Sequence, residues 1–293
     1  MQAFEFVSAR NAHHAVELLA AHGPAVKPLA GGTDLLADYK TDTHGVRTIV
    51  DISRADDLKG IVVTDDGLRI GALATHSEIM ASPFIRENFP ALVDAAHSIG
   101  ALQTRNLGTL GGNLVTCVPS MDSGPTLVAL DARVTIAGPD GMRKVPLAEL
   151  FVGPRKTALR YDEILTEIVI PKENIGKPAA FLKFGLRKGQ ALSLVNVGVS
   201  AWVEAGTFRK AGIGLGAVAP TVIRASEAEA WIEGRPANEE TMVEAGRIAS
   251  NEARPITDFR ASAEYRRELV AVLTKRGLAK AAELAAAKQG QSK

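Results

Sequence analysis

Two short segments built around adjacent glycines constrain this chain more than any other feature. The first is Leu29-Ala30-Gly31-Gly32-Thr33-Asp34-Leu35, and the second, Gly108-Thr109-Leu110-Gly111-Gly112-Asn113, lies far downstream. Because glycine has no Cβ atom, such a pair lets backbone N–H groups approach a bulky anion. A single pair is more often a tight turn, but two on one chain could clamp a dinucleotide from both sides. The two segments are candidate diphosphate-binding loops.

Length and net charge limit the classes of protein to which this chain can belong. With 293 residues, 46% of them hydrophobic, the chain can bury a large core and form two or three domains. A net charge of +1 provides no general field for nucleic acid or for an anionic membrane. The N-terminus lacks the basic and apolar regions of a signal peptide, and no run is long enough to span a bilayer. We therefore expect a cytoplasmic protein that binds no nucleic acid and has no transmembrane segment.

The single cysteine, Cys117, limits the disulfide and metal chemistry that this chain can carry out alone. It excludes an intrachain disulfide, a four-cysteine zinc site and an iron–sulfur cluster held by this chain alone. Beside the second loop, Cys117 is interpreted as a small buried apolar residue. No metal site is expected, since the histidines have no acidic or cysteine partner at ligand spacing. No residue is assigned a catalytic role, because neither a nucleophile–base pair nor a nicotinamide fingerprint is visible, and the chemistry must come from a cofactor.

Alternating strand and helix patterns predict two lobes in the first part of the chain. The smaller lobe, at about 1–55, is predicted from apolar periodicity and from the turn residues between the segments. In order, its segments are a strand at 4–7, a helix ending at His22, a strand at 26–29, a helix at 35–40 and a strand at 48–52. The larger lobe, at about 56–176, is predicted to contain a hairpin at 60–71, a helix at 91–99 and strands at 133–137 and 164–170.

The last part of the chain is predicted to be a separate domain behind a linker at 172–178. It begins with three antiparallel strands, and Pro220 is expected to end their sheet. Helical periodicity follows from Ser226, and the tail 285–293 is expected to be frayed. The three strands are predicted at 179–186, 192–203 and 208–218.

The loops, their order and several further segments resemble one family over nearly the whole chain. That family is the FAD-binding medium subunit of molybdenum hydroxylases, which includes xanthine dehydrogenase and aerobic carbon monoxide dehydrogenase. Besides the two loops, the matching segments are Pro119, Asp122 and Pro125, then 151–157, 163–165, 183–187 and 196–201. The resemblance implies an α+β fold. A two-lobed FAD-binding domain of the PCMH (vanillyl-alcohol oxidase-like) type would span 1–176, and a C-terminal domain of the carbon monoxide dehydrogenase flavoprotein type, with a three-stranded antiparallel sheet and helices, would span 177–288.

The resemblance also implies which residues bind FAD. The two loops would wrap its diphosphate and ribityl chain through backbone N–H groups and hydroxyls. Asp122 would hydrogen-bond the ribityl or adenosine side, Leu165 would pack near the ring system, and Lys183 would reach the pyrimidine end of the isoalloxazine. The full set is Leu29, Ala30, Gly31, Gly32, Thr33, Asp34, Leu35, Gly108, Thr109, Gly111, Gly112, Asn113, Thr116, Asp122, Leu165 and Lys183.

Each polar assignment has an ordinary alternative. Asp122 could simply cap the helix that begins near Pro125. Lys183 on a strand is usually a solvated residue.

By the same resemblance, a large partner subunit would carry molybdopterin. A small partner subunit would carry two [2Fe–2S] clusters. The chain would then be the electron-transfer subunit of a heterotrimer, and its FAD would pass electrons to NAD+, oxygen or a quinone. The substrate and the acceptor stay open. One alternative is a free-standing flavin reductase of the same fold, with Ser193, Ser200, Glu204 or Glu227 as proton donor. The other is a flavin-free assembly or scaffold protein.

Overall fold

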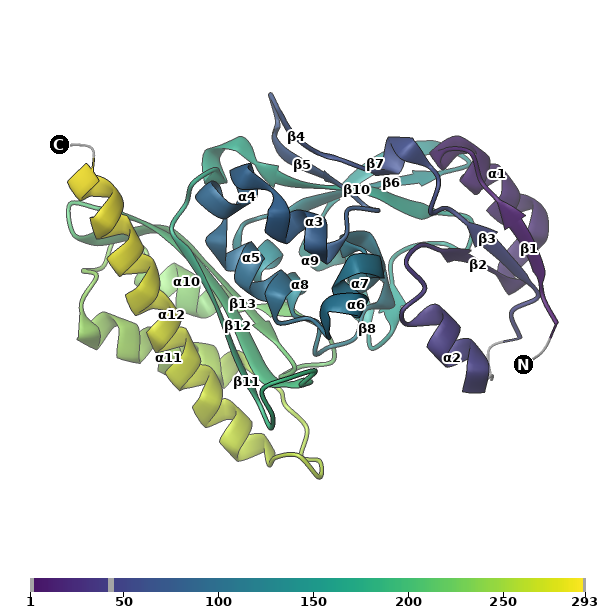
Figure 1. Ribbon diagram of the computed structural model, residues 1–293. Coiled ribbons are helices and arrows are strands. Elements are labelled where there is room, and N and C mark those ends of the chain that lie inside the picture. Colours follow the sequence, from purple (N-terminus) through teal and green to yellow (C-terminus); the bar gives the residue numbers. More distant parts are fainter. Residues whose placement is uncertain (1–2, 42–44, 292–293) are drawn as a thin grey trace.

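A parallel three-stranded sheet forms the N-terminal lobe of the computed structural model, which describes residues 3–41 and 45–291 (Figure 1). The strands β1 (Glu5–Ser8) and β2 (Val26–Leu29) flank β3 (Thr48–Asp51), which is entirely buried. The helix α1 (Ala12–His22) covers the sheet with its buried apolar residues, and α2 (Leu35–Thr41) follows the first glycine loop directly. The predicted segments of this lobe are confirmed, with the last strand at the centre of the sheet.

The second lobe contains a five-stranded antiparallel sheet in the order β4-β5-β10-β6-β7. The predicted hairpin, helix and strands are present. The strands are β4 (Ile61–Thr64), β5 (Gly67–Gly71), β6 (Arg133–Gly138), β7 (Gly141–Pro146) and β10 (Ile164–Pro171), with a small hairpin of β8 (Phe151–Gly153) and β9 (Lys156–Thr157). The helices are α3 (His76–Ala81), α4 (Pro83–Asn88), α5 (Pro90–His97), α6 (Leu102–Leu107), α7 (Leu110–Thr116), α8 (Ser123–Ala129) and α9 (Leu147–Leu150).

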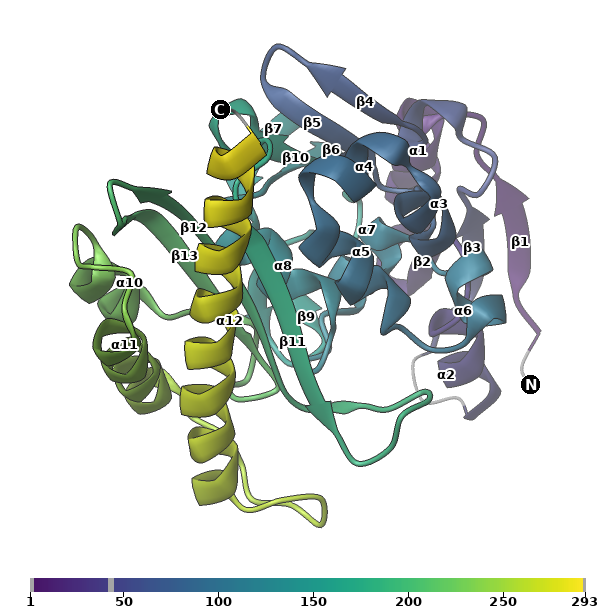
Figure 2. The same cartoon turned by 60° about the vertical axis from the view of Figure 1, so that its left-hand side comes forward.

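The C-terminal domain is a sheet with two long helices on its outer face (Figures 1 and 2). The three predicted strands are β11 (Ala179–Gly185), β12 (Ser193–Glu204) and β13 (Thr207–Gly216). The prediction of three strands is corrected, because the chain turns back after Pro220 and β14 (Ile223–Arg224) pairs with β13. The helices are α10 (Ser226–Ile232), α11 (Glu239–Glu252) and α12 (Ala263–Gln291).

The predicted fraying of the tail is wrong for residues 285–291, since α12 continues to Gln291. Ala285 is buried, and the Lys288 Nζ atom donates a hydrogen bond to the Gly176 carbonyl at 2.5 Å. Residues 292 and 293 lie outside the described part of the chain. In that part, no helix is both long enough and apolar enough to cross a bilayer.

Glycines on the inner face of the C-terminal sheet hold it against α8 of the second lobe. A Cβ atom built on Gly212 would lie 2.0 Å from the Ala129 carbonyl oxygen, and one on Gly214 would lie 2.2 Å from that of Pro125. Side chains here would push the two domains apart, because cores have no room for added atoms. The missing side chains therefore let the sheet approach the backbone of α8, which is buried along its whole length.

Candidate functional site

The first glycine loop contacts the segment that leads into the second. A Cβ atom on Gly31 would lie only 1.8 Å from the carbonyl oxygen of Leu107. One on Gly108 would lie 3.6 Å from the hydroxyl of Thr33. The two candidate loops, which belong to separate lobes, are therefore brought together by the fold, and Gly31 is needed for this close approach of two backbone segments.

The first loop keeps its backbone donors free. Gly32 adopts a left-handed conformation with φ +69°, and Thr33 and Asp34 are exposed before α2 begins. In the described part of the chain, the N–H groups of residues 31–34 have no hydrogen-bond acceptor. Consecutive free N–H groups in a turn can bind an anion. This part of the predicted site fits a diphosphate.

The second loop differs from its predicted form, because Gly111 and Gly112 lie in the first turn of α7. The Thr109 hydroxyl accepts the Gly112 N–H group at 3.0 Å and so caps the helix. The N–H groups of Leu110 and Gly111 donate to the carbonyls of Ala74 and Ala72 at 2.8 and 2.9 Å. The expectation of free backbone donors is therefore corrected for Leu110, Gly111 and Gly112, because the protein itself already uses their N–H groups. The assignment of this loop to FAD stays a prediction.

Side chains of α7 remain available for a ligand. The Asn113 Oδ1 atom accepts a hydrogen bond from the Ser123 hydroxyl at 2.6 Å, which leaves the amide NH2 group as a donor. The Thr116 hydroxyl donates to the Gly112 carbonyl at 2.8 Å and keeps its lone pairs as acceptors. Both residues are partly exposed. These groups suit the hydroxyls of a ribityl or ribose chain.

Asp122 is the centre of a buried hydrogen-bond network, with 6% of its surface exposed. Its Oδ2 atom accepts from the Lys183 ammonium at 2.5 Å and from the Ser98 hydroxyl at 2.9 Å. Its Oδ1 atom accepts from the Ser193 hydroxyl at 2.7 Å and the Asn196 amide at 2.8 Å. The alternative of a helix cap is wrong, since the side chain makes no capping hydrogen bond to α8.

Lys183 is not a solvated residue of β11, and that alternative is also wrong. Its side chain is 14% exposed, and besides Asp122 it donates to the Ser98 carbonyl at 3.3 Å. An ammonium group has three hydrogens, so one remains for a further acceptor. Leu165 lies on β10, is 4% exposed in the core of the second lobe, and has α7 packed against its strand. The predicted contacts of Lys183 and Leu165 with a flavin stay predictions.

Sequence reasoning missed His76, a buried histidine beside the two loops. Its Cδ2 atom lies 3.4 Å from the Cβ position of Gly108, and its Nδ1 atom has no partner in the described part of the chain. Burial, helped by the nearby positive charge of Arg105, lowers the pKa of His76 to about 4. His76 is therefore neutral at physiological pH. No local pattern marks this residue, because its burial depends on segments distant in sequence.

A second missed contact ties the N-terminal lobe to the second lobe. The Arg155 guanidinium forms an ion pair with Asp38 on α2 at 2.7 Å. Arg155 follows β8, and its own N–H group donates to the Cys117 carbonyl at 2.9 Å. Cys117 is buried, as interpreted from the sequence.

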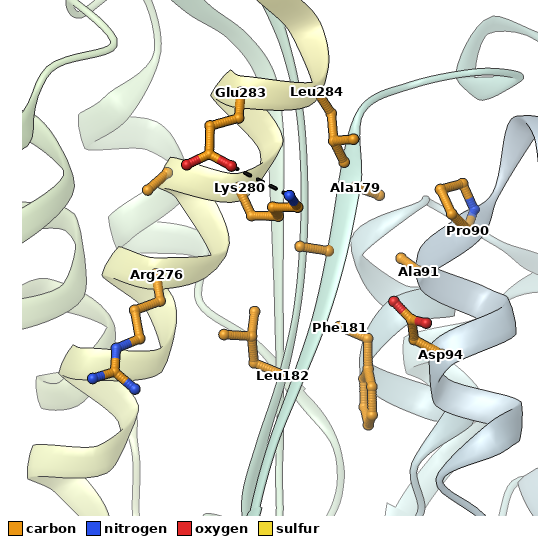
Figure 3. Close-up of a pocket in the computed structure, with 12 residues that line it drawn as sticks. Pro90, Ala91, Asp94, Ala179, Phe181, Leu182, Arg276, Lys280, Glu283 and Leu284 are labelled. Atoms are coloured by element: carbon orange, nitrogen blue, oxygen red, sulfur yellow. Dashed lines mark hydrogen bonds and ion pairs between the residues drawn. The ribbon is translucent and has the colours of Figure 1, made fainter. Parts of the chain in front are cut away.

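One cleft in the described part of the chain lies away from the candidate site. A cleft of about 530 Å³ runs between α5 and α12 over β11 (Figure 3). Its walls are mostly apolar, with Asp94 on one side and the Lys280–Glu283 ion pair on the other. It contains none of the predicted site residues. Among the described residues, no cluster of histidine, cysteine or carboxylate side chains could hold a metal ion.

The two-lobed domain with a free donor loop, joined to a sheet-and-helix domain, is the architecture of known flavoprotein subunits of oxidoreductases, and the chain is one of this class. Residues 2–173 match the family model of the FAD binding domain in molybdopterin dehydrogenase, and residues 180–281 match the CO dehydrogenase flavoprotein C-terminal domain. The chain belongs to the family of FAD-binding medium subunits of xanthine dehydrogenase and carbon monoxide dehydrogenase. The resemblance, the α+β fold class and FAD as the cofactor are thereby confirmed.

Individual relatives extend over almost the whole chain. A xanthine dehydrogenase FAD-binding subunit of Escherichia coli O157:H7 is 34% identical, with 97% of this chain and 99% of the relative covered. The carbon monoxide dehydrogenase medium chain of Hydrogenophaga pseudoflava is 30% identical, with 94% and 96% covered. Among solved structures, a carbon monoxide dehydrogenase from the same organism has a TM-score of 0.93 at 31% identity, with 97% of this chain and 98% of that chain covered.

Proposed function

We propose that this chain carries electrons between two partners through an FAD held at the contact of its two loops. The electrons would come from [2Fe–2S] clusters on a small partner subunit and leave to NAD+, oxygen or a quinone. A large molybdopterin-bearing subunit would oxidise the substrate in the same cytoplasmic heterotrimer. When bound, FAD supplies the conversion between one-electron and two-electron transfer, which no amino-acid side chain of this chain offers.

The free donors of the first loop carry this proposal. Residues 31–34 present N–H groups that have no acceptor among the described residues, at the point where the two lobes touch. They would bind the diphosphate, and Asn113 and Thr116 would bind the hydroxyls of the adjoining chain. Lys183, held by Asp122 and Ser98, would direct its remaining N–H toward the ring system, where a cation stabilises negative charge.

The first test is whether the purified chain retains FAD and whether the loops are responsible. We expect a yellow protein with one FAD per chain, and loss of the flavin in Gly32→Val and Gly112→Val. The Gly112 variant is informative because a new Cβ atom would meet only the Thr109 hydroxyl within the protein, at 2.9 Å. The matched control is Gly189→Val, where nothing lies within 4 Å. A colourless chain that cannot be reconstituted with FAD would favour the scaffold alternative.

The electron-carrier role has its own test. The isolated chain with bound FAD should not be reduced rapidly by substrates of the complex, whereas the assembled complex should be. Rapid reduction without partners would contradict the proposal and favour the free-standing reductase. Two of that alternative's candidate proton donors are already engaged, because Ser193 donates to Asp122 and Ser200 donates to the Ala129 carbonyl at 2.6 Å.

A further inference from the structure

The helix that follows the first glycine loop has little apolar packing of its own. Among residues 35–39 of α2, Tyr39 alone is buried. A helix of only two turns is marginal unless other parts of the fold hold it. The hairpin of β8 and β9 lies next to α2 (Figure 1) and supplies such a contact, because Arg155 in its turn forms the ion pair with Asp38 at 2.7 Å.

The turn that carries Arg155 is fixed to the end of the helix that follows the second loop. Cys117 is the residue directly after α7. Its carbonyl accepts the Arg155 N–H group at 2.9 Å. Its Sγ atom lies 3.4 and 3.3 Å from the carbonyl oxygens of Gly153 and Lys156, within hydrogen-bond distance of both. Arg155 therefore links α2 to α7, and these are the two helices that continue the two loops.

The backbone of the turn does not account for an arginine at this position. Arg155 has φ +56°, a left-handed conformation that is unfavourable for a residue with a Cβ atom and that glycine adopts freely. Cys117, to which it bonds, is also left-handed, with φ +51°. Residues held in such conformations cluster at functional sites. A glycine would suit the turn better, so the ion pair with Asp38 is the feature that an arginine explains.

We propose that Arg155 is a positioning residue for FAD. Its ion pair with Asp38 would fix α2, and with it the free N–H groups of residues 31–34, relative to the side chains of α7. A ligand that spans both loops loses less entropy on binding when the loops are already aligned, and it is then released more slowly. This inference rests on the proposed function, since it requires that both loops bind the same FAD.

The rate at which the full chain releases FAD, followed by the rise in flavin fluorescence after dilution, tests the proposal. Arg155→Gly removes the guanidinium, keeps the N–H group for Cys117 and suits the left-handed turn. It should release FAD about two- to fivefold faster, the size expected for an exposed ion pair. The thermal midpoint of the FAD-free variant should stay close to that of the wild type, because glycine relieves the backbone. Arg155→Lys, which keeps the charge, should release FAD more slowly than Arg155→Gly.

A double-mutant cycle assigns the effect to the ion pair. Asp38→Asn should also speed release, and the double variant with Arg155→Gly should be no faster than the faster single variant, because both changes remove one interaction. At about 1 M salt the rates of wild type and Arg155→Gly should converge, since an exposed pair is screened.

Two control variants separate this effect from general changes. Ala205→Gly relieves a left-handed residue of the C-terminal domain, with φ +47°. Lys144→Met breaks the exposed ion pair with Asp66. Neither variant should alter the rate of FAD release.

Several results would overturn the proposal. They are a wild-type rate of FAD release in Arg155→Gly, additive effects of the two single variants, or equal acceleration by either control. A thermal midpoint of Arg155→Gly that falls equally with and without FAD would make Arg155 a merely structural residue, which also contradicts the proposal. A wild-type chain that binds no FAD, or a Gly32→Val variant that binds it normally, would instead overturn the proposed function.

Discussion

The Lys183 Nζ atom lies 2.5 Å from the Asp122 Oδ2 atom, and this ion pair joins the C-terminal sheet to the FAD-binding domain. The lysine comes from β11 and the aspartate immediately precedes α8. Both side chains are largely withdrawn from solvent, at 14% and 7% exposure. The residue expected to face the flavin is thus also part of the joint between the domains.

Lys183→Met should therefore lower the free energy of unfolding as well as alter flavin binding. Removing one partner of a buried pair costs roughly 3–5 kcal/mol, and we expect the lower end because three neutral donors still serve Asp122. Urea unfolding measures the loss. Lys144→Met is the control, since its pair with Asp66 is exposed and worth about 0–1 kcal/mol. Equal effects of the two variants would mean that the Lys183–Asp122 pair is not structurally important.

Gly31→Ala should separate the two loops. The new Cβ atom would fall 1.8 Å from the Leu107 carbonyl oxygen, so one lobe must move. Overpacking of this kind costs about 1–3 kcal/mol, and we expect a lower thermal midpoint together with a lower FAD-to-protein ratio. Gly189→Ala, which adds a methyl group in open space, should change neither quantity. Full FAD content in the Gly31 variant would disprove the need for this contact.

The buried His76 should make stability fall on mild acidification. Its pKa of about 4 in the folded state lies below the 6.5 of an unperturbed histidine, so the unfolded chain binds the proton more readily. Stability is then complete above pH 6.5 and declines by up to about 3 kcal/mol as the pH falls toward 4. Urea unfolding at pH 7 and pH 5 should show a smaller difference for His76→Gln than for the wild type. If the loss of stability between pH 7 and pH 5 is the same in the variant as in the wild type, His76 is not its source. The control is His13→Gln, at an exposed position.

Lys177→Met should stabilise the protein. This ammonium is 1% exposed without a hydrogen-bond partner in the described part of the chain, and its burial lowers the pKa of Lys177 to about 8 despite the nearby carboxylate of Asp131. Below pH 8 the folded state bears the cost of a buried charge, up to about 3 kcal/mol, and the cost disappears as the pH rises toward 10.5. The gain in urea midpoint should be larger at pH 7 than at pH 10. A destabilised variant at pH 7 would show that the ammonium is needed. The control is Lys172→Met, at an exposed position of the same segment, which should leave the urea midpoint unchanged.

The sequence alone specified the strands of the first lobe, the hairpin and the strands at 133–137 and 164–170 in the second, and the first glycine loop, because these features are local. It did not predict β7 or the small hairpin of β8 and β9. The hairpin before Gly71 follows from its turn residues, and the approach of Thr33 to Gly108 agrees with the expectation that two loops act together. The family resemblance added the cofactor, since no single loop could define it.

Tertiary structure alone decided what the polar residues do. Asp122 was open to two roles, and its actual partners come from residues 98, 183, 193 and 196, which no local pattern connects. The same reason explains Gly111, whose pattern predicts a free donor but whose N–H group donates to the distant Ala72 carbonyl. Neighbouring residues determine local secondary structure and turns. The partner of a buried charge or N–H group depends instead on which distant segments pack together.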